Sequence, residues 1–179
     1  DTITHMKNIV RDIAQYAKKI ATQFPVVSIQ GPRQSGKTTL ARTLFQNYGY
    51  VNLEHPDTRA EAEADGASFL RLHPAPLIID EVQRVPSLLS RIQVAVDEHP
   101  GENGQYILTG SHQPALQSSV GQSLAGRVGG LTLLPLSLAE LAAAGIRSER
   151  ESRIVEGFMP RLFSEHQSSF ELYRNYAAT

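Results

Sequence analysis

Cysteine does not occur in this chain of 179 residues, and no apolar run is long. Without cysteine the chain can form no disulfide, thiolate metal site, iron–sulfur cluster or cysteine nucleophile. Apolar-rich stretches such as 131–136 fall far short of the roughly 20 residues that a membrane span needs. No charged start followed by an apolar core and a small-residue cleavage site is present. We therefore expect a soluble, cytoplasmic protein with no membrane partner.

An excess of charge of either sign is also missing. Lys and Arg number 17 and Asp and Glu number 18, so the formal net charge is −1. This balance gives no support to nucleic-acid binding, which relies on an excess of positive charge. The six histidines are never three or four residues apart, so their spacing predicts no histidine metal site. No serine stands in G-x-S-x-G, which leaves acyl-transfer chemistry unsupported.

Apolar runs that alternate with helical patterns are present, and they predict the fold. Apolar residues make up 41% of the chain, enough for one main globular domain. The apolar runs are nearly continuous, which is typical of a parallel sheet covered on both faces. The expected fold class is α/β, with five parallel strands flanked by helices. Strands are expected at 26–30, 50–53, 76–80, 105–109 and 131–134, and helices at 6–24, 37–48, 58–64, from 86 onward and at 137–144.

The pattern divides the chain into three segments. Residues 1–24 are expected to form an amphipathic helix, whose apolar face we interpret as packed on the domain's own sheet rather than on a membrane or partner. Residues 25–145 hold the alternating core. In residues 146–179 the pattern weakens into a mixed-charge stretch and a short tail, so a boundary is expected near Gly145.

A glycine-rich loop lies between the first predicted strand and the helix after it. It fits G-x-x-x-x-G-K-[ST] at every fixed position, in the strand–loop–helix context of a phosphate-binding loop. Lys37 would neutralise β- and γ-phosphate oxygens, Thr38 would place a hydroxyl on Mg²⁺, and Thr39 would bond an α-phosphate oxygen. A plain glycine turn is the alternative. The candidate nucleotide-binding residues are Gly31, Pro32, Arg33, Gln34, Ser35, Gly36, Lys37, Thr38 and Thr39.

Two acidic residues end the third predicted strand. Asp80 and Glu81 follow Leu77-Ile78-Ile79, at the strand end where open α/β sheets bind ligands. Asp80 is predicted to hold Mg²⁺, and Glu81 to act as the base that orients the attacking water. Two solvent-exposed acids at a strand end are the alternative, which the preceding phosphate loop makes less favoured.

Two weaker signals follow later in the chain. The fourth predicted strand ends in Thr109-Gly110-Ser111, where a hydroxyl of Thr109 or Ser111 could bond the γ-phosphate or the attacking water; an ordinary glycine turn is an equal alternative. Arg127 precedes the fifth strand and could reach a phosphate in its own subunit or in a neighbour's. A surface salt bridge at Arg127 is as favoured from spacing alone.

Several segments in order resemble a widespread family of prokaryotic AAA+-type ATPases, from about Phe24 to the end of the chain. They are PVVSIQGPRQSGKTTL, LIIDEVQRVPSLL, YILTGSHQPAL, SLAGRVGGLTLLPLSLAEL and GFMPRLF. The resemblance implies that the first is Walker A, that DEVQ is an extended Walker B, and that Ser111 is at a sensor position. It implies that Arg127 resembles the arginine that such proteins present to a neighbour's nucleotide, and hence a homo-oligomer.

The resemblance also carries expectations beyond the core. Family members continue into a C-terminal domain, and the segment at 173–176 resembles the approach to it, so we expect a truncated chain. At 156–160 this chain has Glu-Gly-Phe-Met-Pro where the family more often has Gly-Gly-Phe-Pro. ATP rather than GTP is implied by the resemblance, together with the absence of an N-K-x-D-like segment.

Three functions remain open. The favoured one is a Mg²⁺-dependent ATPase whose turnover drives a conformational change in a C-terminal domain or partner. A nucleotide-gated module that holds ATP or ADP with little turnover is the main alternative. A small-molecule P-loop kinase is less favoured, because residues 92–126 contain no arginine to build an acceptor site.

Overall fold

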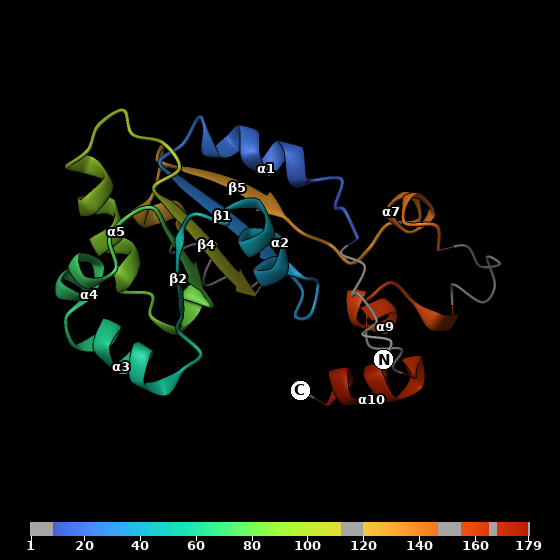
Figure 1. Cartoon of the computed structure of the whole chain (residues 1–179). Helices are drawn as coiled ribbons and strands as arrows, with labels where there is room; N and C mark the ends of the chain where they lie inside the picture. Colours follow the sequence, from blue (N-terminus) through green and yellow to red (C-terminus); the bar gives the residue numbers. More distant parts are fainter. Residues whose placement is uncertain (1–8, 112–119, 147–154, 165–167, 179) are drawn as a thin grey trace, which may run out of the picture.

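The structure is a computed structural model that describes residues 9–111, 120–146, 155–164 and 168–178 (Figure 1). Its strands are β1 (Val26–Gly31), β2 (Gly49–Asn52), β3 (Leu77–Asp80), β4 (Tyr106–Ser111) and β5 (Val128–Thr132). Its helices are α1 (Ala14–Ala21), α2 (Lys37–Leu44), α3 (Pro56–Ala64), α4 (Gly66–Leu72), α5 (Leu88–Asp97), α7 (Leu138–Ala143), α9 (Pro160–Ser164) and α10 (Ser169–Ala177), with a 3-10 turn η1 (Val82–Arg84).

The strands form a single five-stranded sheet in the order β2-β3-β4-β1-β5. Every pairing is parallel, with Val26 of β1 beside Tyr106 of β4 on one side and Val128 of β5 on the other. This confirms the expected α/β class with a five-stranded parallel sheet. Because all strands run the same way, their carboxyl ends lie at one edge, which is where such sheets bind ligands.

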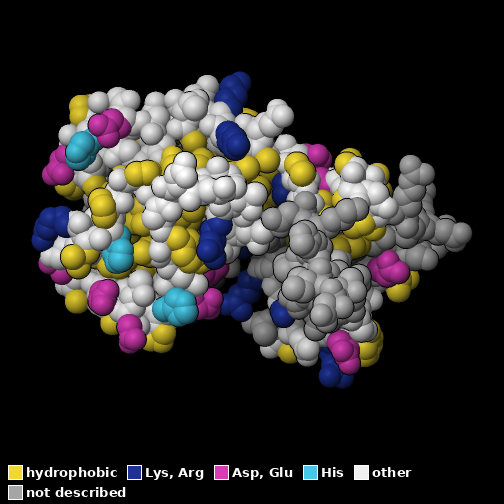
Figure 2. Space-filling view, in the orientation of Figure 1, with side chains coloured by type: hydrophobic (Ala, Val, Ile, Leu, Met, Phe, Trp, Pro, Cys, Tyr) yellow, Lys and Arg dark blue, Asp and Glu magenta, His cyan; other side chains and the backbone are white. Residues whose placement is uncertain are grey.

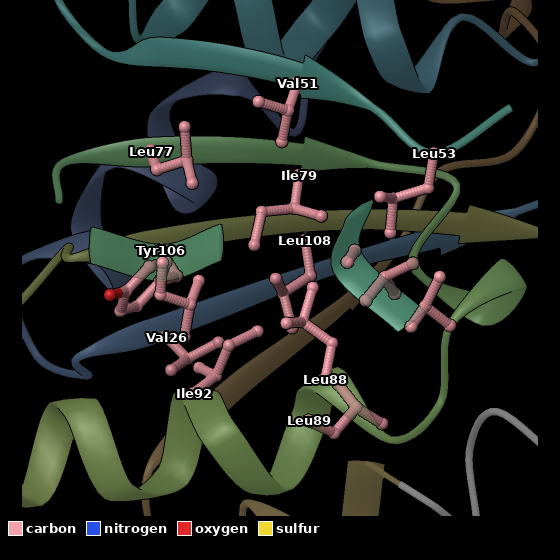
Figure 3. Packing of buried hydrophobic residues seen from close by; sticks show 14 of the residues in the cluster. Val26, Val51, Leu53, Leu77, Ile79, Leu88, Leu89, Ile92, Tyr106 and Leu108 are labelled. Atoms are coloured by element: carbon pink, nitrogen blue, oxygen red, sulfur yellow. The ribbon is translucent and has the colours of Figure 1, made fainter. Parts of the chain in front are cut away.

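Alternate strand residues build a core on each face of the sheet. On one face, Ile79 and Leu108 pack with Leu89 and Ile92 of α5 (Figure 3). On the other face, Val27 and its neighbours pack against α1 and α2. The side chains of a strand alternate between its two faces, so the nearly continuous apolar runs supply both cores.

Helix α1 lies on the domain's own sheet, as interpreted from its amphipathic pattern. Its residues Ala17 and Ile20 are buried in the core that contains Val27 and Leu40. The predicted start of this helix was wrong, because helix begins at Ala14 and residues 9–11 are not helical. Contacts made by Arg11 and Asp12, described below, hold this segment against other parts of the chain. Residues 1–8 lie outside the described part of the chain.

Other element boundaries also differ from the sequence expectations. Strand β5 covers residues 128–132 rather than 131–134. The predicted start was too late because glycine is disfavoured in strands, yet Gly129 and Gly130 pair with β1 here. Helix α2 ends at Leu44 rather than at residue 48. Helix α3 begins at Pro56 rather than at residue 58, because proline is well suited to the first turn of a helix. Helix α4 was missed; the Asp65 side chain caps it by accepting from two backbone N–H groups.

Helix α1 packs closely on Gly129 in strand β5, which leaves no room for a side chain there. A Cβ there would overlap Ile20 and lie 2.8 Å from Cδ2 of Phe24. Gly129→Ala is therefore expected to lower the free energy of unfolding by about 1–3 kcal/mol through overpacking. Gly130→Ala is the matched control, because a Cβ there meets nothing within 4 Å. Urea unfolding of both variants measures the difference, and equal stability would contradict the packing argument.

Charged side chains of both signs occur on the face of the molecule that Figure 2 shows. On the face shown in Figure 2, Lys and Arg side chains lie among acidic and uncharged ones, in keeping with the net charge of −1. In the described ranges, none of the helices has both the length and the apolar character that crossing a membrane would need.

Candidate functional site

The glycine loop joins the end of the central strand β1 to the start of α2. Gln34 and Gly36 have positive φ values of 60° and 93°, and alternation of this kind turns successive backbone N–H groups inward to make an anion-binding concavity. Gly31 is required for a different reason, because a Cβ there would overlap the backbone carbonyl oxygen of Leu133. The loop is thus shaped for an anion at the amino end of a helix.

Lys37 lies at the start of α2 with its side chain directed back along the loop. Its Nζ donates to the carbonyl oxygens of Gly31 at 3.1 Å and Pro32 at 2.8 Å, and the residue is only 6% exposed. Burial lowers the pKa of Lys37, while the carboxylates of Glu81 and Asp80 oppose that shift. The ammonium therefore lies at the loop, beside the two acids at the end of β3.

Asp80 is the centre of a cluster of hydroxyl groups at the end of β3. Thr38 Oγ1 donates to it, at 3.0 Å from Oδ1 and 2.9 Å from Oδ2, although the two residues are 42 positions apart. Thr109 Oγ1 hydrogen-bonds Oδ1 from β4, which lies between β1 and β3. Tyr50 donates its hydroxyl to Oδ2 at 2.9 Å from β2. The structure therefore brings Thr38 and Asp80, the predicted metal ligands, into direct contact.

Tyr50 remains a neutral hydrogen-bond donor at ordinary pH. Burial and the neighbouring Asp80 carboxylate raise the pKa of Tyr50 to about 12. The Tyr50 ring also lies under the guanidinium of Arg42, whose Cζ is 4.7 Å from the ring centroid.

Glu81 turns the chain sharply out of β3. It has a left-handed backbone, with φ of 59° and ψ of 43°, a conformation that costs a non-glycine residue on the order of 1 kcal/mol and that is concentrated at functional sites. Its Oε2 accepts a hydrogen bond from Nε2 of Gln83, and its backbone N–H points to Thr109 Oγ1 at 3.4 Å. Glu81 therefore lies next to Asp80, one of the two predicted metal ligands, with its carboxylate oriented by Gln83.

Ser111 ends β4 directly beside the beginning of the loop, because its register partner is Gly31. The side-chain oxygens of Ser111 and of Ser35 in the loop are both buried, and neither has a hydrogen-bond partner among the described residues. Buried hydroxyls without a partner are rare and call for an explanation. Ser35 belongs to the loop itself, and Ser111 lies beside its first residue, so both hydroxyls are at the loop.

Arg127 lies at the other end of the sheet. It directly precedes β5, and the residue after it pairs with Val26 at the start of β1, whereas the loop follows the end of β1. Its guanidinium makes a two-pronged ion pair with Asp97, at 2.6 and 2.8 Å. In this position Arg127 lies away from the phosphate loop of its own chain, and its ion pair is the surface salt bridge that the sequence left open as an alternative.

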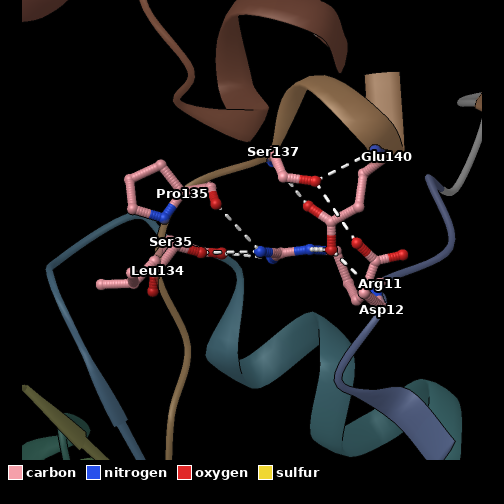
Figure 4. Close-up of polar contacts among 7 residues, drawn as sticks. All are labelled: Arg11, Asp12, Ser35, Leu134, Pro135, Ser137 and Glu140. Carbon is pink, nitrogen blue, oxygen red and sulfur yellow. Dashed lines mark hydrogen bonds and ion pairs between the residues drawn. The ribbon is translucent and has the colours of Figure 1, made fainter. Parts of the chain in front are cut away.

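Arg11 and Glu140, which the sequence interpretation did not select, join three distant segments (Figure 4). The Arg11 guanidinium donates to Glu140 at 2.9 Å, to the Ser35 carbonyl of the loop at 2.9 Å, and to the Leu134 carbonyl at 2.6 Å. Glu140 also accepts from the backbone N–H groups of Asp12 and Ser137. The network holds the amino-terminal segment, the phosphate loop and the start of α7 together.

An apolar pocket of about 200 Å³ opens beside the loop. It lies between the amino-terminal segment, α2 and α9, and Gly36 and Thr39 form its border with the phosphate loop. Its other lining residues include Val10, Ala14 and Leu40. Sequence patterns could not reveal this pocket, because its walls are ordinary apolar residues from segments far apart in the chain.

The order of the strands, the loop after β1 and the carboxylate after β3 together define a P-loop NTPase fold. A protein-family model described as an AAA domain matches residues 23–142. The chain therefore belongs to this AAA-domain family of prokaryotic P-loop ATPases.

Two curated relatives and one solved structure are similar to the chain. Proteins of Mycobacterium tuberculosis and Mycobacterium bovis, both named as uncharacterized, are 32% identical over 142 residues. The match covers 75% of this chain and 30% of each relative, so the chain spans less than a third of their length. A Walker-type ATPase of Pyrococcus abyssi has the same fold, with a TM-score of 0.60, 15% identity and coverage of 93% of this chain and 68% of that one.

Proposed function

We propose that this chain binds ATP and hydrolyses it in a Mg²⁺-dependent reaction. The observation that carries the proposal is the contact between Thr38 and Asp80 at 2.9–3.0 Å beside the loop that holds Lys37. A hydroxyl and a carboxylate are the oxygen donors that Mg²⁺ uses together with substrate phosphates. Thr38 and Asp80 would hold the ion together with the phosphates of the nucleotide.

Each residue of the site has a separate task in the proposed reaction. The loop N–H groups and Lys37 bind the phosphates, and bound Mg²⁺ supplies further positive charge to the phosphate oxygens. Glu81 accepts a proton from the attacking water, while Gln83 orients its carboxylate. The unpaired hydroxyls of Ser111 and Ser35 support phosphate contacts at these positions.

The apolar pocket supports a nucleotide rather than a simple phosphate as the ligand. It adjoins the loop at Gly36 and Thr39, on the side toward α9. An adenine ring has flat faces that pack well against apolar groups, and small-molecule sites are lined mainly by apolar side chains. In the proposal the base enters this pocket while Thr39 contacts the α-phosphate.

Arg127 acts, in this proposal, on the nucleotide of a neighbouring subunit within a homo-oligomer. The hydrolysis rate per subunit is therefore expected to increase with protein concentration. Glu81→Gln and Arg127→Ala should each be nearly inactive alone, but mixing them should restore part of the activity. A subunit with Glu81→Gln still supplies Arg127 to the intact site of its Arg127→Ala neighbour.

The mixing experiment has a control and a clear negative result. Asp97→Asn breaks the same ion pair as Arg127→Ala but retains the guanidinium, so it should keep its activity. If Asp97→Asn and Arg127→Ala lowered the hydrolysis rate equally, Arg127 would only stabilise the fold. A rate per subunit that does not change with concentration, with no recovery on mixing, would contradict a role in trans.

A nucleotide-gated binding module is the second candidate function. One observation favours it: the arginine predicted to assist catalysis is paired with Asp97 at the far end of the sheet from the loop. A chain that acted alone would then hold ATP or ADP with little turnover. In either case we propose that the nucleotide changes the conformation of a C-terminal domain or partner, with the Arg11–Glu140 network as the first contact beyond the loop.

A further inference from the structure

Tyr50 has no assigned role in the reaction, yet it contacts the proposed metal ligand directly. We infer that Tyr50 is a positioning residue that orients Asp80 toward Thr38 and so sets the Mg²⁺ concentration at which nucleotide binds productively. This inference rests on the proposed function, since it concerns the same site. It would make the edge strand β2, which contains no part of the two motifs, a determinant of metal dependence.

The position of Tyr50 in the sheet explains how it reaches the carboxylate. Strand β2 pairs with β3 so that Asn52 lies beside Asp80 and Tyr50 beside Ile78. Residues two apart on a strand point to the same face. The long Tyr50 side chain therefore extends along that face, and its hydroxyl reaches Oδ2 of Asp80 at 2.9 Å. A shorter side chain at position 50 could not make this contact.

The ring of Tyr50 is held by the same helix that carries the other metal ligand. Arg42 lies one turn after Thr38 on α2, so the two share a face of that helix. The Arg42 guanidinium lies over the Tyr50 ring, and with Arg42 in place Tyr50 is still 37% exposed. Tyr50 is thus braced by α2 on one side and bonded to β3 on the other, and it links the two elements whose separation decides whether Thr38 and Asp80 meet.

The expected consequence is specific to the metal. Thr38 lies within hydrogen-bond distance of both carboxylate oxygens of Asp80, Tyr50 donates to Oδ2, and Thr109 hydrogen-bonds Oδ1. Without the Tyr50 hydroxyl, Oδ2 loses a fixed donor and the carboxylate gains rotational freedom. Partners that orient a metal ligand through a hydrogen bond typically affect metal affinity by about 10–100-fold. Phosphate binding by the loop itself should not change, because the Tyr50 hydroxyl donates to Asp80 and not to a loop residue.

The test compares metal-free and metal-dependent binding of the fluorescent nucleotide mant-ADP. Tyr50→Phe should bind mant-ADP as the wild type does in EDTA, but should need about tenfold more Mg²⁺ for half-maximal enhancement of binding. Electron paramagnetic resonance of Mn²⁺ added to the ADP complex gives a direct second readout, in which more free Mn²⁺ is expected. Arg42→Met should shift the Mg²⁺ midpoint in the same direction by a smaller factor.

Tyr48→Phe is the matched control. This tyrosine precedes the same strand but packs against Phe45, at 5.2 Å between ring centroids, so its Mg²⁺ midpoint should equal that of the wild type. Two results would overturn this inference while leaving the proposed function intact. One is a Mg²⁺ midpoint of Tyr50→Phe equal to that of the wild type. The other is a loss of mant-ADP affinity in Tyr50→Phe that is as large in EDTA as in Mg²⁺. Wild-type protein that binds no mant-ADP with or without Mg²⁺ would instead overturn the proposed function, and this inference with it.

Discussion

Glu81→Gln is expected to lower the rate of ATP hydrolysis by about 100-fold or more while leaving ATP affinity nearly unchanged. Glutamine has almost the same shape as glutamate, but its amide cannot accept a proton from the attacking water. The Thr38–Asp80 pair and the loop are untouched by the change. Phosphate release and equilibrium binding of ATP, measured on the same preparation, separate the two effects.

Glu98→Gln is the control for this experiment. Glu98 is exposed after the end of α5, near the amino ends of the strands and far from the loop, so neither rate nor affinity should change. Hydrolysis that continues at the wild-type rate in Glu81→Gln would remove Glu81 from the catalytic role. Loss of ATP affinity together with the rate would indicate that Glu81 instead shapes the binding site.

Glu140→Gln is expected to lower the free energy of unfolding at neutral pH by roughly 3 kcal/mol. Glu140 is 5% exposed and accepts from Arg11, from the backbone of Asp12 and from the backbone of Ser137. Its neutral replacement would leave the buried Arg11 without its carboxylate partner. Urea unfolding measures the difference, and Glu63→Gln on the exposed side of α3 is the matched control.

The contacts of Glu140 make the loss of stability in Glu140→Gln depend on pH. Burial opposes ionisation, but hydrogen bonds from Ser137, Asp12 and Arg11 lower the pKa of Glu140 below its usual 4.5. A group whose pKa is depressed by folding stabilises the protein above its unfolded pKa and loses this contribution as the pH falls through the folded value. The stability gap between wild type and Glu140→Gln should therefore narrow as the pH is lowered below about 4. A gap that is constant between neutral and acid pH would show that packing, rather than charge, causes the loss.

The fold and the two motifs could be predicted because their signals are local. The glycine loop needs particular residues within eight positions, and the strand before Asp80 needs only a short apolar run. The predicted start of strand β5 was too late in the chain, because a glycine gives no strand signal in the sequence. Glycine is needed at position 129 because helix α1, more than a hundred positions earlier in the sequence, packs against it. The start of α1 was placed too early because the contacts of Arg11 with 134–140 outweigh the helical pattern of residues 9–13.

The amino-acid sequence was therefore sufficient to predict the α/β class and to locate the loop at 31–38 and the pair of acids at 80–81. Tertiary structure alone decided which groups meet Asp80 and where Arg127 lies. Tyr50 reaches that carboxylate only because β2 pairs with β3 in one register, and Arg127 is far from the loop only because β5 runs parallel to β1. Contacts of this kind depend on strand order and register, which arise from packing of the whole chain rather than from any short segment.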